Sequence, residues 1–237
     1  MEDPISPTRR PFALALGGIG GYVDGVGFVT LFGLFTAHMS GNVARTGVEL
    51  GESDASLALT RGIPVIVFVA MSTVGFLVVR RRHARGAWAF RPLLVFEAVL
   101  LTAFMVIGTV WRDDHTLLPE SGAFYVLATL VVGAMALQTV AVRSVSGVEV
   151  HTTFLTGMLS AVAQDIVEWR ADGDRSAAAR LRLQGGLVVV YLAGAALGAL
   201  LVDAWGLWCI ALALVGLAVV GTIGARQAGP PPVRRTA

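Results

Sequence analysis

Charged residues and cysteine are both scarce in this chain of 237 residues. Only 14% of the residues are charged, whereas a soluble domain carries about 25%. The single cysteine, Cys209, lies in an apolar run, which excludes disulfide frameworks and thiolate metal sites. All 18 basic residues are arginine, and the net charge of +2 is too small to indicate a nucleic-acid partner. The low charge instead predicts an integral membrane protein that contacts the lipid bilayer.

Signatures of enzymes are also absent from the sequence. It contains no His-Glu-x-x-His, no Gly-x-Ser-x-Gly and no Walker loop for phosphate binding. The string GGIGG at 17–21 lies inside an apolar run rather than after a strand, so it does not predict a dinucleotide site. We therefore expect no enzymatic activity, no cofactor and no bound metal ion.

Long apolar runs dominate what is present. Crossing a bilayer as a helix takes about 20 apolar residues. Six runs meet this length, at 13–35, 62–79, 92–111, 122–141, 186–202 and 206–225. The predicted fold class is all-α, a polytopic transmembrane helical bundle of six spans. Its expected parts are a tail (1–12), a three-span unit (13–111), an external loop (112–121), a second three-span unit (122–225) and a disordered tail (226–237).

Arginine placement predicts the orientation of these spans. Six spans would put the arginine-rich segments on one face, namely both tails and residues 80–91 and 169–182. By the positive-inside rule, both termini are then cytoplasmic. The semi-apolar segment 152–169 is left over, and we interpret it as a re-entrant or interfacial helix. A seventh span there is the alternative, although it would move the C-terminal arginines outside.

The leftover segment resembles an earlier one. When residues 38–50 are placed over 154–166, Ser40-Gly41 falls on Thr156-Gly157. The same offset puts Tyr22 on Gln138, and 67–79 matches 190–202 with a longer loop. Three spans in each unit would turn the second unit upside down, which is the inverted-repeat architecture of many secondary transporters. Chance similarity among apolar helices is the alternative.

The stretch GYVDGVGF…GLFTAHMSGN, residues 21–42, resembles the signature of the YoaK-type family of bacterial multi-pass membrane proteins. The shared pattern is an aromatic residue and an aspartate in the first span, followed by a Thr/Ser-Gly-Asn turn. TTFLTG at 152–157 and the six-span layout extend the resemblance over nearly the whole chain. The resemblance implies a location in the bacterial inner (plasma) membrane and implies no particular activity.

Asp24 is the first candidate for a functional residue. A carboxylate in a span costs a few kcal/mol to insert, so it usually faces the bundle interior or a water-filled cavity. We interpret it as a proton or cation site, and the alternative is an aspartate paired with a hydroxyl, a backbone amide or an arginine. The cluster His38-Met39-Ser40-Gly41-Asn42 follows. Ser40 or Asn42 is predicted to cap a short helix at 43–50, whose N-terminus would suit an anion or a carbonyl group.

The remaining candidates are polar residues near the other predicted helix interruptions. Thr156 and Gly157 would form the second helix start, and Gln138 and Thr139 would line the site or make ordinary interhelical hydrogen bonds. His38 and His151 each precede a Ser/Thr-Gly pair, as proton relays or as plain loop residues. Glu97, near the start of the third span, would either face a cavity or extend towards Arg91.

These patterns together predict a secondary transporter or permease-like protein for an unidentified small solute, with protons as the candidate coupling ion. Asp24 would be the coupling group, and the two Ser/Thr-Gly elements would contact the substrate. The alternative is a membrane scaffold or sensor that transports nothing and uses small-residue runs such as 194–201 for helix association. A homo-oligomer is a further candidate partner. A polar cavity that reaches Asp24, Asn42 and Thr156 together would favour transport, whereas transport is rejected if these three lie apart and face lipid or bare loops.

Overall fold

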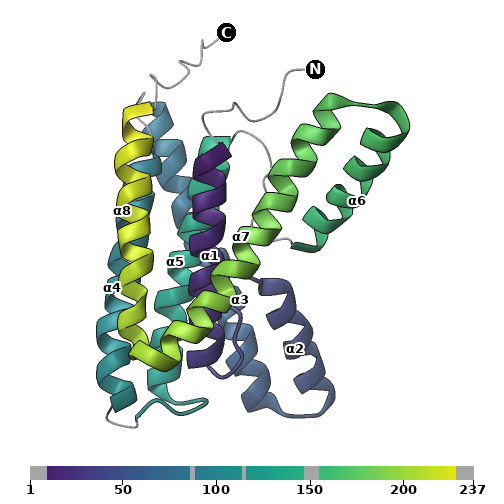
Figure 1. Cartoon of the computed structure of the whole chain (residues 1–237). Coiled ribbons are helices and arrows are strands. Elements are labelled where there is room, and N and C mark those ends of the chain that lie inside the picture. Colours follow the sequence, from purple (N-terminus) through teal and green to yellow (C-terminus); the bar gives the residue numbers. More distant parts are fainter. Residues whose placement is uncertain (1–9, 86–88, 114–115, 147–154, 228–237) are drawn as a thin grey trace.

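The computed structural model describes residues 10–85, 89–113, 116–146 and 155–227. These residues form helices and contain no strand. In chain order the elements are α1 (Arg10–Thr30), α2 (Met39–Gly51), α3 (Ala55–Ala84), α4 (Phe90–Asp113), α5 (Gly122–Ser146), α6 (Leu155–Asp172), α7 (Arg175–Trp205), the 3-10 turn η1 (Gly206–Cys209) and α8 (Ile210–Gln227). The predicted all-α polytopic helical bundle is confirmed (Figure 1).

The predicted apolar runs coincide with the long helices. In the described residues, five helical segments are long and apolar enough to cross a membrane. The fifth, 175–223, contains both α7 and α8, which η1 joins at a sharp bend (Figure 1). The leftover segment forms α6, which is not among these five segments and packs on α7. α1 begins and α8 ends at the same end of the bundle, the upper end in Figure 1.

The hydrophobic core lies between α1, α4, α5 and α8. In α5, 72% of the most apolar 18-residue stretch is buried, and in α3 only 11% of the corresponding stretch is buried. Phe104 of α4 and Phe124 and Leu137 of α5 are fully buried. α5 is therefore the central helix, whereas α3 turns side chains such as Ile66, 69% exposed, towards the surrounding lipid. An apolar outer surface is what a bilayer solvent requires.

Glycines bring α1 and α7 into backbone contact. A methyl group added at Gly21 would overlap the carbonyl group of Tyr191, and one at Gly25 would overlap that of Ala195. From the other side, one at Gly198 would overlap the carbonyl oxygen of Tyr22. Small residues at this spacing allow membrane helices to approach closely. The glycines of the first span therefore serve helix packing, and this packing brings Tyr191 close to α1.

Two helical hairpins lie at opposite ends of the bundle. α2 and α3 meet at the lower end in Figure 1, and α6 and α7 meet at the upper end. Each turn has a left-handed residue followed by a capping aspartate, Ser53 (φ 62°) with Asp54 in the first hairpin and Gly173 (φ 65°) with Asp174 in the second. Both aspartate side chains accept a backbone N–H from the first turn of the helix that follows, as N-caps do.

The polar residues of α6 attach it to α7. The guanidinium group of Arg180 donates to Asp165 at 2.8 Å and to Glu168 at 2.6 Å. Gln164 in turn donates to Glu168 at 2.8 Å. These contacts explain why a semi-apolar segment carries three such side chains: they join two helices of one hairpin.

Candidate functional site

The first transmembrane helix ends earlier than the sequence predicts. The apolar run extends to Phe35, but α1 stops at Thr30, and residues 31–38 form a loop. Phe32 (φ 53°) and Gly33 (φ 79°) both adopt left-handed backbone conformations, which an α-helix cannot accommodate. α2 then begins at Met39. The cluster at 38–42 is thus the start of a second helix.

One oxygen of the Asp24 carboxylate supports this loop. Asp24 lies in α1 and is 4% exposed. Its Oδ1 accepts hydrogen bonds from the backbone N–H of Thr36 at 2.5 Å, the Thr36 hydroxyl at 2.8 Å and the backbone N–H of Ala37 at 2.9 Å. Buried backbone N–H groups outside helices and sheets need an acceptor. Asp24 supplies it, and its hydroxyl and backbone-amide partners are those of the paired aspartate that the sequence left as the alternative.

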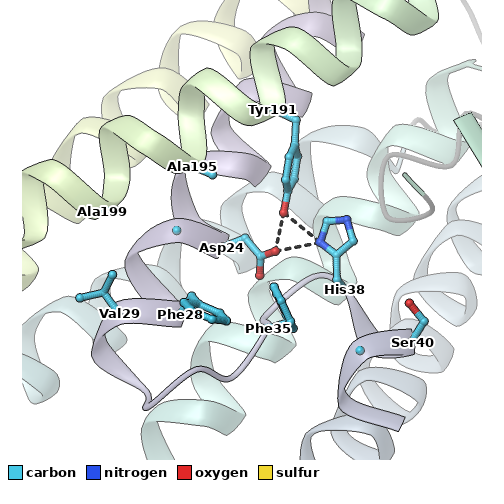
Figure 2. A pocket seen from close by; sticks show the side chains of 11 residues that line it. Asp24, Phe28, Val29, Phe35, His38, Ser40, Tyr191, Ala195 and Ala199 are labelled. Atoms are coloured by element: carbon cyan, nitrogen blue, oxygen red, sulfur yellow. Dashed lines mark hydrogen bonds and ion pairs between the residues drawn. The ribbon is translucent and has the colours of Figure 1, made fainter. Parts of the chain in front are cut away.

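The other oxygen of Asp24 belongs to a three-residue cluster, which we call the Asp24–His38–Tyr191 triad. Oδ2 lies 2.8 Å from Nδ1 of His38 and accepts a short hydrogen bond from the Tyr191 hydroxyl (Figure 2). The same hydroxyl lies 2.9 Å from Nδ1 of His38. An ionised Asp24 can only accept hydrogen bonds, so its contact with His38 requires the tautomer with the proton on Nδ1. Nε2 of His38 is buried and has no hydrogen-bond partner in the described part of the chain.

Asn42 holds the loop from the other side. It is fully buried, its amide nitrogen donates to the carbonyl oxygen of Phe35 at 2.7 Å, and its amide oxygen accepts from the Phe35 N–H at 3.3 Å. The expectation that Ser40 or Asn42 caps α2 is wrong. The capping position belongs to His38, whose side chain makes no capping hydrogen bond because it turns to Asp24 instead.

Two arginines complete the support of the loop. Arg61 of α3 donates to the carbonyl oxygen of Phe32 at 3.0 Å, and Arg45 of α2 donates to that of Gly33 at 2.9 Å. Carbonyl groups at the C-terminal end of a helix carry partial negative charge, which cations stabilise. The loop is therefore held by a carboxylate at its end and by guanidinium groups at its beginning.

A pocket of about 470 Å³ opens beside the triad. It lies between α1, α7 and the start of α2, and Figure 2 shows the side chains that line it. The lining residues are Asp24, Gly25, Phe28, Val29, Phe35, His38, Ser40, Gly41, Tyr191, Ala195 and Ala199. The triad supplies the polar end of this pocket, and the remaining wall is mostly apolar.

The structure gathers some predicted site residues and separates others. Asp24, His38, Ser40 and Gly41 line one pocket, and Asn42 braces the loop next to it. Tyr22 lies away from this pocket and donates to the carbonyl oxygen of Cys209 at 2.8 Å, which fastens η1 to α1.

The two predicted polar residues of α5 make ordinary helix contacts. Gln138 donates to the carbonyl oxygen of Leu16 in α1 at 2.6 Å. Thr139 donates at 2.9 Å to the carbonyl oxygen of Met135 in its own helix. Neither residue lines the pocket beside Asp24, so the interhelical reading fits Gln138 and an intrahelical bond accounts for Thr139.

Thr156 and Gly157 do not join the site. Both are exposed in the first turn of α6, which packs on α7 in the hairpin opposite to α2 (Figure 1). The cavity expected to reach Asp24, Asn42 and Thr156 together is therefore not formed in this conformation. His151 and residues 152–154 lie outside the described residues.

Sequence reasoning missed Tyr191 and the two phenylalanines of the pocket. Tyr191 is one of three tyrosines in the chain and sits in an apolar run. A buried tyrosine hydroxyl usually finds a partner, so a tyrosine within a span was an available signal. Phe28 and Phe35 carried no such signal, because aromatic residues are ordinary in membrane helices. Only the close crossing of α1 and α7 identifies what Tyr191 contacts.

The side chain of Glu97 is buried and does not extend towards Arg91, which was one of its two predicted arrangements. It is 0% exposed, and neither carboxyl oxygen has a hydrogen-bond partner among the residues that the structure describes. It lies on the core face of α4, between Leu93 and Leu101 along the same helix, and both of these are buried. An ionised carboxylate without a partner is very costly to bury, so Glu97 lies in the bundle as a neutral acid.

The fold and the site together define a multi-pass helical membrane protein with an interrupted first helix and a buried polar triad. The chain belongs to a family described as "Protein of unknown function (DUF1275)", whose model matches residues 12–223. It is also 26% identical over 146 residues to the UPF0700 transmembrane protein YoaK of Bacillus subtilis (strain 168). That alignment covers 62% of this chain and 62% of the relative, less than two thirds of its length. The predicted membership of a YoaK-type family is confirmed.

No solved structure matches the chain. The relative is a bacterial transmembrane protein, in agreement with the apolar helices of this chain. The chain is accordingly a membrane protein, and the cytoplasmic location of its termini stays a prediction from the arginine pattern.

Proposed function

We propose that this protein is a secondary transporter or permease-like protein for a small solute, with its binding site at the pocket beside Asp24. The observation that carries the proposal is the Asp24–His38–Tyr191 triad, a buried, ionisable cluster at the wall of a pocket inside the membrane-spanning region. Interrupted helices with unwound backbone at membrane depth occur where they line cavities. In secondary transporters such interruptions hold substrate and coupling ions.

The arrangement of helices supports two inverted units, α1–α4 and α5–α8. The short helices α2 and α6 lie at opposite ends of the bundle, and both are followed by a left-handed residue and a capping aspartate. The helix contacts correspond as well. Gly75 of α3 packs on Val140 of α5, while Gly198 of α7 packs on Tyr22 and Val26 of α1. Inverted units of this kind support alternating access, in which one unit rocks against the other around a fixed site.

The two units differ in their polar residues. The sequence offset pairs Asp24 with Val140, so only the first unit carries a carboxylate at this position. Asp24 is then the coupling group of the proposed transporter, with His38 and Tyr191 as its partners. If the charge at Asp24 differs between the occupied and the empty site, the protein would prefer a different conformation in each case. Such a difference is what coupling requires.

The test is uptake of a pooled mixture of metabolites into proteoliposomes. We expect solute-specific uptake by the wild-type protein and loss of that uptake in Asp24→Asn, because the amide keeps the oxygen that supports the loop but removes the charge. Asp203→Asn is the matched control, since Asp203 is exposed near the end of α7 and lies outside the pocket. Equal uptake in wild type and Asp24→Asn would remove Asp24 from the mechanism.

The inverted topology has a test of its own. Val43 on α2 is 54% exposed and Leu159 on α6 is 53% exposed, so single cysteines at these positions form a matched pair. A membrane-impermeant maleimide added to intact cells should label Val43→Cys and spare Leu159→Cys. The native Cys209 is 1% exposed and contributes little background. Labelling of both cysteines from one side would contradict the inversion.

A membrane scaffold or sensor is the rival proposal. It expects the small-residue run at 194–201 to serve helix association, and Gly194 and Gly198 do pack against α1 within the same chain. This contact is equally compatible with both proposals. Failure of the uptake experiment in every arm would leave this rival as the better account.

A further inference from the structure

We propose that the pocket beside Asp24 binds an organic cation and that protonation of His38 releases it. This inference rests on the proposed function, because it names the substrate class of the same site. It depends on three features of the pocket: its net charge, its aromatic walls and the position of one titratable ring.

The charge of the pocket is negative. Asp24 lines it, and no arginine is among the lining residues. The three N–H and O–H donors on Oδ1 come from neutral groups, as does the Tyr191 hydroxyl on Oδ2. Hydrogen bonds stabilise a carboxylate without cancelling its charge. With His38 neutral, the triad therefore presents one uncompensated negative charge to the pocket, which an anion would avoid and a cation would neutralise.

The walls of the pocket are rich in aromatic rings. Phe28 and Phe35 lie with ring centroids 4.9 Å apart, and the His38 and Tyr191 rings lie 5.0 Å apart beside Asp24 (Figure 2). Rings attract organic cations through their π faces, and aromatic cages recognise quaternary ammonium groups in this way. A carboxylate with aromatic neighbours thus suits a cation whose charge is surrounded by carbon.

The remaining wall explains why an organic cation fits better than a metal ion. Val29, Ala195 and Ala199 are apolar, and the volume of about 470 Å³ is within the range of small-molecule sites. A hard metal ion needs several oxygen ligands around it. In the described part of the chain, no group of three or more His, Cys, Asp or Glu residues is placed to hold a metal ion. A bulky cation instead gains from burying its carbon surface here.

His38 provides the release step. The charged and titratable groups that face it are Asp24 from α1 and Tyr191 from α7. When His38 takes up a proton, its positive charge lies 2.8 Å from Asp24 and the net charge of the triad becomes zero. A proton on His38 and a cation in the pocket then compete for the same carboxylate. Competition of this kind is what proton–substrate exchange requires.

The experiment uses two ions of similar shape and opposite charge, tetraphenylphosphonium and tetraphenylborate. Binding of each to the purified full chain in detergent is measured by equilibrium dialysis, with protein-free micelles subtracted. We expect the phosphonium to bind and the borate not to bind. Asp24→Asn should weaken phosphonium binding about tenfold or more, and Asp203→Asn should leave it unchanged.

Two further variants separate the aromatic and proton contributions. Phe28→Leu keeps the apolar wall but removes one ring, so phosphonium binding should weaken roughly three- to thirtyfold. Lowering the pH from about 8 to about 5.5 should weaken binding in the wild type, because a proton on His38, 2.8 Å from Asp24, competes with the cation for the carboxylate. His38→Asn keeps a donor near the Nδ1 position and cannot take up a proton, so the pH dependence should disappear.

Equal binding of the two ions, or unchanged phosphonium binding in Asp24→Asn, overturns the inference. The outcome is distinguishable from failure of the proposed function. If uptake depends on Asp24 but phosphonium does not bind, the proposed transport function stands and the organic-cation substrate is rejected. Phosphonium binding that depends on Asp24 without any uptake would keep the cation site and reject transport.

Discussion

Asp24 and Glu97 are both buried carboxylic acids within membrane-spanning helices, yet their surroundings are opposite. Asp24 accepts or shares five hydrogen bonds with Thr36, Ala37, His38 and Tyr191. Glu97 has none among the residues that the structure describes. The comparison teaches that burial alone does not place a carboxylate in a candidate site. What distinguishes Asp24 is a loop that needs acceptors and a pocket that exposes its second oxygen.

The sharpest test of this contrast replaces each acid by leucine. Asp24→Leu leaves two backbone N–H groups, the Thr36 hydroxyl and the Tyr191 hydroxyl without their acceptor. Removing a buried charged partner of this kind costs about 3–5 kcal/mol in the free energy of unfolding. Denaturant unfolding in detergent micelles measures the loss. A loss below about 1 kcal/mol would show that the loop does not depend on Asp24.

The second test removes one partner of the triad. Tyr191→Phe takes away the hydroxyl that donates to Asp24, and a hydrogen bond to a charged group contributes about 1.5–3 kcal/mol. Tyr22→Phe is the matched control, because its hydroxyl donates to the neutral carbonyl of Cys209 and its loss should cost about 1 kcal/mol. The same unfolding measurement compares them. If Tyr22→Phe lowers the free energy of unfolding as much as Tyr191→Phe does, the charge of Asp24 does not strengthen its hydrogen bond with Tyr191.

The third test moves α7 away from α1 without changing a side chain of the triad. A methyl group at Gly21 would overlap the Tyr191 carbonyl group, so Gly21→Ala should destabilise the chain by about 1–3 kcal/mol. Gly185→Ala is the control on α7, because a methyl group there meets nothing within 4 Å. Thermal melting in detergent should show a lower midpoint for Gly21→Ala only. Equal melting midpoints for the two variants would mean that α1 and α7 can move apart without loss of stability.

The smallest expected effect has the opposite sign. Glu97→Leu replaces an unpartnered buried acid by an apolar side chain among leucines, so it should be neutral or stabilise the chain by about 1 kcal/mol. Unfolding in detergent and phosphonium binding are measured together, and binding should be unchanged because Glu97 is not in the pocket. A destabilisation of several kcal/mol would indicate that Glu97 has a partner in another conformation.

Much of the fold and part of the site could be predicted from the sequence. The apolar runs located the long helices because a bilayer demands apolar segments of a set length. Asp24 stood out for the same reason, since a carboxylate in such a segment is rare and costly. The end of α1 could not be located, because Phe32 and Gly33 leave the helix at a point where the hydropathy does not change. The start of α2 was also predicted wrongly, because His38 holds the capping position and its side chain contacts Asp24, 14 residues earlier, instead of the helix.

Transmembrane character, the family and the choice of Asp24 as a candidate are thus properties of the sequence by itself, because they depend on local composition and on single costly residues. The tertiary structure alone decided what Asp24 does. Its partners Thr36, His38 and Tyr191 come from the following loop and from a helix 167 residues away. They meet because glycines let α1 and α7 touch along their backbones. Glu97 carries the same chemical group and lacks these neighbours, so its sequence signal leads to a buried acid and not to a site.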